Sequence, residues 1–198
     1  MSVATARTAM AAHELILGGA RSGKSRLAEA RASAWLATPG RQALLLATAQ
    51  AGDEEMAARI ARHQADRAAR VPALATLEVA GPQGPGLAAA LAAYSTPQRL
   101  LVVDCLTLWL TQEALPVHGT PAPAAAVQAA SDELVRVLRG LPGAVVLVSN
   151  EIGLGVMPLG RETRQFVDAL GWLHQAVAAA CARVTLVVAG CELTVKGR

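Results

Sequence analysis

The sequence has 198 residues, of which 53% are hydrophobic and 17% charged, which excludes a disordered chain and suits one domain. Its 18 basic and 15 acidic residues leave a formal net charge of +3, too small for a dedicated nucleic-acid binder, and 3% aromatic residues disfavour a base-stacking surface. The three cysteines have no CxxC spacing, so we expect reduced thiols in a cytoplasmic protein. No apolar run reaches the roughly 18 residues of a membrane span, so we expect no membrane insertion.

Residues 1–13 precede the first apolar run, and we expect them to form a flexible extension ahead of one α/β domain over residues 14–198. Short apolar runs then alternate with longer alanine-rich segments, and Leu100–Val103 and Val145–Val148 are continuously apolar. This pattern predicts a doubly wound, mostly parallel sheet flanked by helices. We expect strands at 14–17, 42–47, 75–79, 99–103, 144–149 and 183–189, an edge strand at 193–196, and helices at 24–36, 53–70, 86–94, 106–114, 124–139 and 161–182.

A glycine-rich segment, GGARSGKS at residues 18–25, follows the first expected strand and precedes a helix. It has the GxxxxGK[ST] pattern of a phosphate-binding loop, in which backbone N–H groups and a helix N-terminus face phosphate oxygens. Lys24 supplies an ammonium for the β- and γ-phosphates and Ser25 a hydroxyl for Mg²⁺. Because Lys24 begins a helix, we expect it to be exposed and its removal to cost little stability. The expected phosphate-binding residues are Gly18, Gly19, Ala20, Arg21, Ser22, Gly23, Lys24 and Ser25.

Asp104 ends the apolar strand that begins at residue 99. A carboxylate at the carboxyl end of a strand beside a phosphate loop can hold Mg²⁺ through water. Asp is also a good N-cap for the helix expected at 106–114, so the residue itself leaves two interpretations open. The neighbouring phosphate loop favours the metal-binding interpretation.

The helix expected at 53–70 carries Arg59, His63 and Arg67 at positions i, i+4 and i+8, next to its apolar positions. An imidazole between two guanidinium groups suits a nucleophile or acid/base that faces phosphate. A solvated basic face or a structural histidine fits the same residues, and the residues alone favour that reading. His13, His118 and His174 carry weaker signals, and no histidine has metal-ligand spacing, so we expect no zinc site.

Five segments, taken together and in order, resemble one known family. They are GGARSGKS at 18–25, ATAQ at 47–50, DEEMAARI at 53–60 followed by His63, DCLT at 104–107 and SNEIGLG at 149–155. From about residue 14 to 196, the chain is similar to the bifunctional adenosylcobinamide kinase/adenosylcobinamide-phosphate guanylyltransferases of cobalamin biosynthesis. The resemblance implies a P-loop NTPase fold of the RecA-like kind.

The same resemblance implies two reactions. ATP or GTP phosphorylates the aminopropanol hydroxyl of adenosylcobinamide, and GMP then passes from GTP, through an enzyme histidine, to adenosylcobinamide phosphate. The family pattern R-I-x-x-H places that histidine at His63, which with Lys24 would be catalytic. A homotrimer is also implied, in which a neighbouring subunit can complete the site. Beyond the phosphate loop, the implied nucleotide contacts are Thr48, Ala49, Gln50, Gln64, Ala65, Asp66, Arg67, Glu78 and Asp104, with Ser25 and Asp104 at the metal.

Two alternatives stay open at this point. One is a monofunctional small-molecule P-loop kinase in which His63 is structural, and the other is a nucleotide-dependent switch or nucleic-acid ATPase, which the low aromatic content disfavours. The chain also departs from the family pattern. It has Gln64, Ala68 and Leu159 where the family often has Arg, Pro and an acidic residue, respectively. These departures remove no proposed catalytic group.

Overall fold

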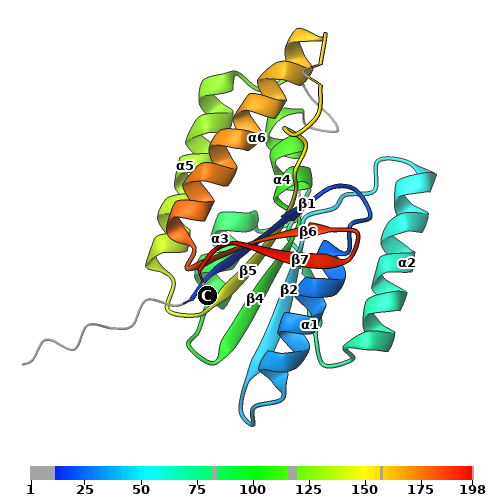
Figure 1. Cartoon of the computed structure of the whole chain (residues 1–198), viewed down its shortest axis with the longest axis vertical. Coiled ribbons are helices and arrows are strands. Elements are labelled where there is room, and N and C mark those ends of the chain that lie inside the picture. Colours follow the sequence, from blue (N-terminus) through cyan, green and yellow to red (C-terminus); the bar gives the residue numbers. More distant parts are fainter. Residues whose placement is uncertain (1–11, 82–83, 116–119, 157, 198) are drawn as a thin grey trace, which may run out of the picture.

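Seven strands form one sheet in the order β3-β2-β4-β5-β1-β6-β7, as the computed structural model of the chain shows (Figure 1). Strands β1 to β6 run parallel, and β7 pairs antiparallel with β6 at one edge. The structure describes residues 12–81, 84–115, 120–156 and 158–197. The strands are β1 (Glu14–Gly18), β2 (Gln42–Ala47), β3 (Ala75–Glu78), β4 (Arg99–Asp104), β5 (Val145–Asn150), β6 (Arg183–Val188) and β7 (Cys191–Lys196).

The edge strand begins at Cys191, two residues earlier than the sequence predicts. Ala189 and Gly190 both have positive φ, at 51° and 81°, which is typical of the two-residue turn that joins antiparallel strands. Because the chain reverses within these two residues, pairing starts at once between Val188 and Cys191.

Six helices lie in the described part of the chain, each within two residues of its predicted position. Asp53 caps the second of them, because its Oδ1 accepts the Met56 N–H at 2.7 Å and satisfies a backbone donor of the first turn. The helices are α1 (Lys24–Leu36), α2 (Glu54–Arg70), α3 (Leu87–Tyr94), α4 (Leu106–Ala114), α5 (Ala124–Gly140) and α6 (Arg161–Ala180).

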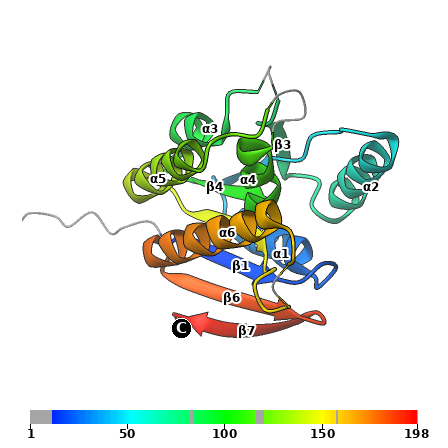
Figure 2. The ribbon, with the colours of Figure 1, turned by 90° about the horizontal axis from the view of Figure 1, so that it is seen from above.

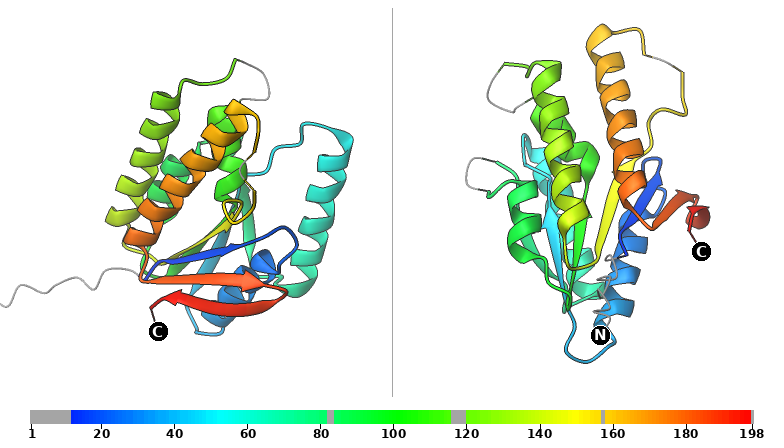
Figure 3. Two further views of the ribbon diagram at one scale, coloured as in Figure 1. Left: turned by 45° about the horizontal axis from the view of Figure 1, so that its top comes forward. Right: turned by 90° about the vertical axis from the view of Figure 1, so that its left-hand side faces the viewer.

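The sheet separates two apolar cores. Val102 and Val148 pack with Leu27 of α1 on one face, whereas Val103 and Leu147 pack beneath α3, α4, α5 and α6 on the other. The helices α5 and α6 pack along each other (Figure 3). Successive residues of β4 and β5 therefore face opposite cores, which explains why both strands are apolar throughout. The predicted doubly wound, mostly parallel α/β fold is confirmed.

Helix α2 lies outside α1, at the margin of the molecule (Figures 1 and 2). Arg67 is the one buried residue of this helix. Near the end of α2, Arg70 forms an ion pair with Glu29 of α1, and the buried Val71 follows. The anchored part of α2 is therefore its C-terminal end, and the longer N-terminal part, with His63, is largely exposed.

His13 belongs to the packed part of the chain. Its Nε2 lies 3.0 Å from the Leu138 carbonyl oxygen, and its own carbonyl accepts the N–H groups of Ala182 and Arg183. Residues 1–11 of the expected N-terminal extension, and His118, lie outside the described residues. None of the described helices is long and apolar enough to span a bilayer.

Candidate active site

The phosphate loop joins β1 to α1, and glycine is required where it begins. A Cβ at Gly18 would lie 2.4 Å from the Val187 carbonyl oxygen, closer than any side chain can approach. Gly23, at the N-cap of α1, has a φ of +107°, a conformation that residues with side chains rarely adopt. The sequence thus forces a tight turn that leads directly into the N-terminus of α1.

Lys24 is buried rather than exposed, which corrects the expectation from its place at a helix start. Its side chain folds back so that Nζ donates to the Gly19 carbonyl oxygen at 2.6 Å. Burial lowers the pKa of Lys24, while the neighbouring Cys105 and Asp104 oppose this shift.

Asp104 stands at the end of β4 and does not cap the next helix. Cys105 is the N-cap residue of α4, and no side chain makes a capping bond there. The N-cap interpretation of Asp104 is therefore wrong, and its carboxylate, half-buried, is available to another group. Asp104 and Ser25 both lie at the carboxyl end of the sheet, where the phosphate loop follows β1.

Thr48 fixes the end of β4 from the neighbouring strand. Its N–H donates to the Asp104 carbonyl oxygen at 3.1 Å, and its hydroxyl donates to the Cys105 carbonyl and accepts the Cys105 N–H, each at 2.7 Å. Gln112 donates to the Thr48 carbonyl at 2.7 Å. Since Thr48 is fully buried and its hydroxyl is engaged, its side chain positions Asp104. The following Ala49 and Gln50 are half-buried.

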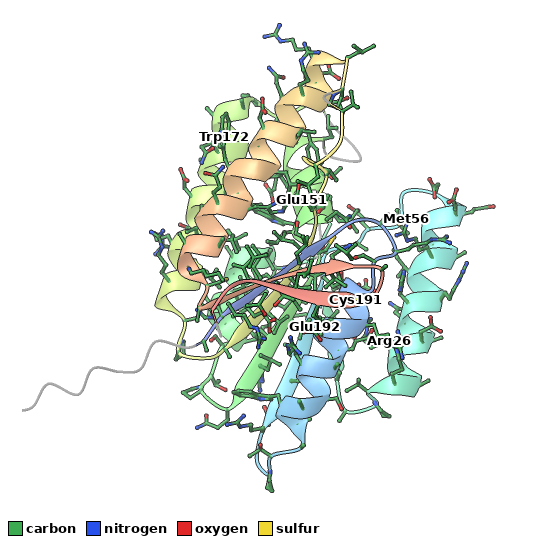
Figure 4. The ribbon with its side chains drawn as sticks, in the orientation of Figure 1. Arg26, Met56, Glu151, Trp172, Cys191 and Glu192 are labelled. Atoms are coloured by element: carbon green, nitrogen blue, oxygen red, sulfur yellow. The ribbon has the colours of Figure 1, made fainter. Side chains whose placement is uncertain are left out.

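The structure does not bring His63 to the phosphate loop. His63 is exposed on α2, as are Ala65 and Asp66. Gln64 reaches Glu78 at the end of β3, with Nε2 donating to Oε1 at 3.4 Å. Met56 lies on the side of α2 that faces the phosphate loop (Figure 4).

Arg67 is the exception on α2. It is 7% exposed, and among the described residues its guanidinium has no hydrogen-bonded or ion-paired partner. A guanidinium that is largely buried by its own helix and lacks a partner among these residues can pair with an anion. Arg67 is therefore suited to bind an anionic group at the inner side of α2.

A polar cluster at the end of β5 was missed by sequence reasoning. His174 of α6 is buried, and its Nε2 lies 2.7 Å from the Ser149 hydroxyl oxygen. Its Nδ1 is 3.7 Å from a carboxylate oxygen of Glu151, which Figure 4 shows between the sheet and α6. The available signal was the position of His174 on the apolar stripe of α6, between Leu173 and Val177.

No cluster of three or more His, Cys, Asp or Glu side chains suited to a metal occurs in the described parts of the chain. A site built from one hydroxyl, one carboxylate and phosphate oxygens needs no such cluster.

Comparison with known proteins shows the family of the chain. The family model described as cobinamide kinase / cobinamide phosphate guanyltransferase matches residues 14–195. The chain belongs to this family. It is 49% identical over 184 residues to the bifunctional adenosylcobalamin biosynthesis protein CobP of Pseudomonas aeruginosa, which covers 93% of this chain and 97% of that protein.

Two further relatives support the membership. The bifunctional adenosylcobalamin biosynthesis proteins CobU of Salmonella typhimurium and Escherichia coli are 37% and 35% identical over 190 residues, which in each case cover 92% of this chain and 98% of the relative. The predicted family and its P-loop NTPase fold are confirmed. The chain is thus a transferase with the two activities of its family, cobinamide kinase and cobinamide-phosphate guanylyltransferase.

Proposed function

We propose that one domain performs both reactions at the carboxyl edge of the sheet, around the phosphate loop. The observation that carries this proposal is that the phosphate loop with Lys24 follows β1 and that Asp104 ends β4, so both lie at the carboxyl end of one parallel sheet. Strand ends at this edge are where open α/β sheets bind ligands. The backbone N–H groups of residues 18–25 cradle the phosphates of ATP or GTP.

In the kinase step, the aminopropanol hydroxyl of adenosylcobinamide attacks the γ-phosphorus and releases its proton to solvent. The bond from that phosphorus to the β–γ bridging oxygen breaks, and the nucleoside diphosphate leaves. Lys24 exchanges its bond to Gly19 for one to the transferring phosphoryl group and stabilises the charge on it. Its burial strengthens this interaction, because fewer waters screen the charge.

The donor set fits Mg²⁺. Ser25 offers a hydroxyl and Asp104 a carboxylate, which are hard oxygen ligands, and Mg²⁺ usually completes its shell with water and phosphate oxygens. When bound, the ion would neutralise phosphate charge.

In the second reaction, His63 is the nucleophile. A nitrogen of the neutral imidazole attacks the α-phosphorus of GTP, the bond from that phosphorus to the α–β bridging oxygen breaks, and pyrophosphate leaves. A phosphate oxygen of adenosylcobinamide phosphate then attacks the same phosphorus and releases the histidine, which gives adenosylcobinamide-GDP. The covalent intermediate splits one transfer into two displacements.

This reaction requires α2 to approach a nucleotide, because His63 is exposed here. Arg67, the one buried residue of α2, would hold phosphate as the helix approaches. The other proposed nucleotide contacts come from the ends of β2 and β3 and from α2. They are Thr48, through its backbone, Ala49, Gln50, Gln64, Ala65, Asp66 and Glu78.

The quaternary structure determines which phosphate loop His63 can reach. We propose a cytoplasmic homotrimer, as the family resemblance implies, in which His63 serves its own phosphate loop or that of a neighbouring subunit. Mixing Lys24 and His63 variants, with adenosylcobinamide phosphate as the substrate, distinguishes the two arrangements. If Lys24 is needed to hold the phosphates of GTP, guanylyl transfer returns in mixed trimers only when the two residues act from different subunits.

Product analysis tests the proposed function. The protein is incubated with GTP, Mg²⁺ and adenosylcobinamide, and the corrinoid product is identified by mass. We expect adenosylcobinamide phosphate first and adenosylcobinamide-GDP later. A product that stops at the phosphate contradicts the second reaction, and an unchanged corrinoid contradicts both.

A further inference from the structure

Asn150 ends β5 between the two strands that carry the site. It pairs in register with Gly18, the first residue of the phosphate loop, while the other side of β5 pairs with β4. Side chains alternate along a strand, so Asn150 faces the same side of the sheet as Val148, which is the α1 side. Asp104 faces that side as well, two residues after Val102. The amide of Asn150 is therefore placed between the phosphate loop and Asp104.

A buried hydrogen-bond chain holds the backbone of Asn150 from the other side of the sheet. The Asn150 N–H donates to Thr107 Oγ1 at 2.8 Å, and this oxygen lies 3.0 Å from Ser149 Oγ. Ser149 Oγ is in turn 2.7 Å from His174 Nε2. Thr107, Ser149 and His174 are all more than nine-tenths buried, so water has little access to replace these bonds.

The hydrogen bonds of this buried chain have one consistent donor-to-acceptor order when His174 is neutral. With its proton on Nδ1, directed at Glu151, the ring accepts the Ser149 hydroxyl hydrogen at Nε2. Ser149 then accepts from Thr107, and Thr107 accepts from the Asn150 N–H, so that each hydroxyl donates once. Burial lowers the pKa of His174, against the opposing effect of Glu151, and thus favours this neutral form.

The order Ser149, His174, Glu151 resembles that of a hydrolytic triad, but the burial excludes this role. The Ser149 side chain is fully buried, at 0% exposure, so no substrate reaches its hydroxyl. Asn150 stands at the end of the hydrogen-bond chain that is nearest the phosphate loop, and this residue is only half-buried.

We infer that Asn150 is a further residue of the phosphate site and that His174 is a positioning residue, which acts on Asn150 through Ser149 and Thr107. The Asn150 amide donates a hydrogen bond to the transferring phosphoryl group, where charge develops during the reaction. The inference rests on the proposed function for the reaction it affects. It adds to that function a donor on the β5 side of the phosphate loop.

The test compares Asn150→Ala with His174→Leu and His174→Gln, by kcat and KM of cobinamide phosphorylation and by nucleotide Kd. We expect Asn150→Ala to lower kcat at least tenfold with less than a threefold change in Kd. His174→Leu should lower kcat about three- to tenfold. His174→Gln should stay within twofold of wild type, because its amide oxygen can accept the Ser149 hydroxyl. Ser149→Ala breaks the next link and replaces His174→Leu if that variant does not fold.

His13→Leu is the matched control. His13 is also a buried histidine that makes one hydrogen bond through Nε2, and burial lowers its pKa as well. It precedes β1, however, and so lies at the amino end of the strands, away from the phosphate loop. We expect this variant to lose stability and to keep kcat within twofold at temperatures where it is folded. Equal losses in His13→Leu and His174→Leu, or no rescue by His174→Gln, overturn the positioning role of His174.

Two further results decide the inference. The double variant Asn150→Ala/His174→Leu should be no slower than Asn150→Ala, because His174 acts through Asn150, and losses that multiply overturn the coupling. A normal kcat in Asn150→Ala, with an active wild type, overturns the inference alone. A wild-type protein that does not phosphorylate cobinamide contradicts the proposed function instead. The same variants are then compared by their rates of slow nucleotide hydrolysis, which needs no corrinoid.

Discussion

Arg70 at the end of α2 holds Glu29 of α1, with Nε 2.8 Å from Oε2. A second guanidinium nitrogen lies 3.3 Å from the other carboxylate oxygen. The Glu29 side chain is only 6% exposed, whereas that of Arg70 is 42% exposed. The pair therefore connects the helix that carries His63 to the helix that starts at the phosphate loop.

Arg70→Ala should slow covalent guanylylation of the protein about three- to tenfold while cobinamide phosphorylation stays within twofold, because α2 carries His63, whereas Lys24, Ser25 and Asp104 lie on other elements. Leaving Glu29 buried without its partner should cost roughly 1–2 kcal/mol of stability, less than for a fully buried pair. Arg136→Ala is the control, since its ion pair with Glu133 on α5 is exposed. Equal losses of both activities in Arg70→Ala contradict a selective role of the pair.

Lys24→Met should lower the rate of cobinamide phosphorylation at least about 100-fold, because it removes the ammonium from the transferring phosphoryl group. Its melting temperature should not fall, since burial already disfavours the charged form of Lys24 and a methionine fills the same space. Steady-state kinetics and thermal unfolding with and without nucleotide check both statements. Near-normal phosphorylation places the chemistry away from this loop.

Acid should destabilise the protein from about pH 6.5 downward through His13 and His174. Burial lowers the pKa of both below the ordinary value of 6.5, so the folded state binds protons less readily than the unfolded state. Their contribution to stability is therefore complete above about pH 6.5 and is lost as the pH falls. The slope is at most about 1.4 kcal/mol per pH unit for each histidine.

Urea unfolding at pH 7.5, 6.5 and 5.5 measures this dependence. His174→Gln and His13→Gln should each flatten the curve in that range, since glutamine does not titrate. A variant that keeps the full wild-type slope excludes its histidine as a source.

One thiol of three should react quickly with an aromatic disulfide reagent in the folded protein. Cys191 is exposed at the start of β7, whereas Cys105 and Cys181 are buried. Burial raises the pKa of Cys105 to about 11 and that of Cys181 to about 12, so neither forms much thiolate near pH 8. Cys191→Ser should remove the fast phase, and a second fast thiol would contradict this assignment of burial.

The helices and strands could be predicted because local signals agree with the packing. The continuous apolar runs of β4 and β5 match a sheet covered on both faces, and Asp53 marks the start of α2 by its capping bond. The phosphate loop followed from its glycines, because Gly18 sits where no side chain fits.

The polar chain behind Asn150 could not be predicted, since its members come from three elements. Thr107, Ser149 and His174 are far apart in sequence, and each alone reads as an ordinary core residue. The burial of Lys24 also escaped prediction, because it arises from a bond to the Gly19 carbonyl within the folded loop. Sequence periodicity reports which face a residue occupies and carries no information about such partners.

In the proposed guanylyl transfer His63 carries GMP, and labelling of the protein with GTP shows whether it does. GTP labelled at the α-phosphate should leave label on the protein, and GTP labelled at the γ-phosphate should not leave the same adduct. The bond should be lost in acid and survive in base, as expected of a phosphoramidate. His63→Ala should abolish the label and guanylyl transfer but keep part of the kinase activity, whereas His13→Gln and His174→Gln should retain the label. A His63→Ala protein that is still labelled from the α-phosphate would exclude His63 as the nucleophile, because another residue would then carry GMP.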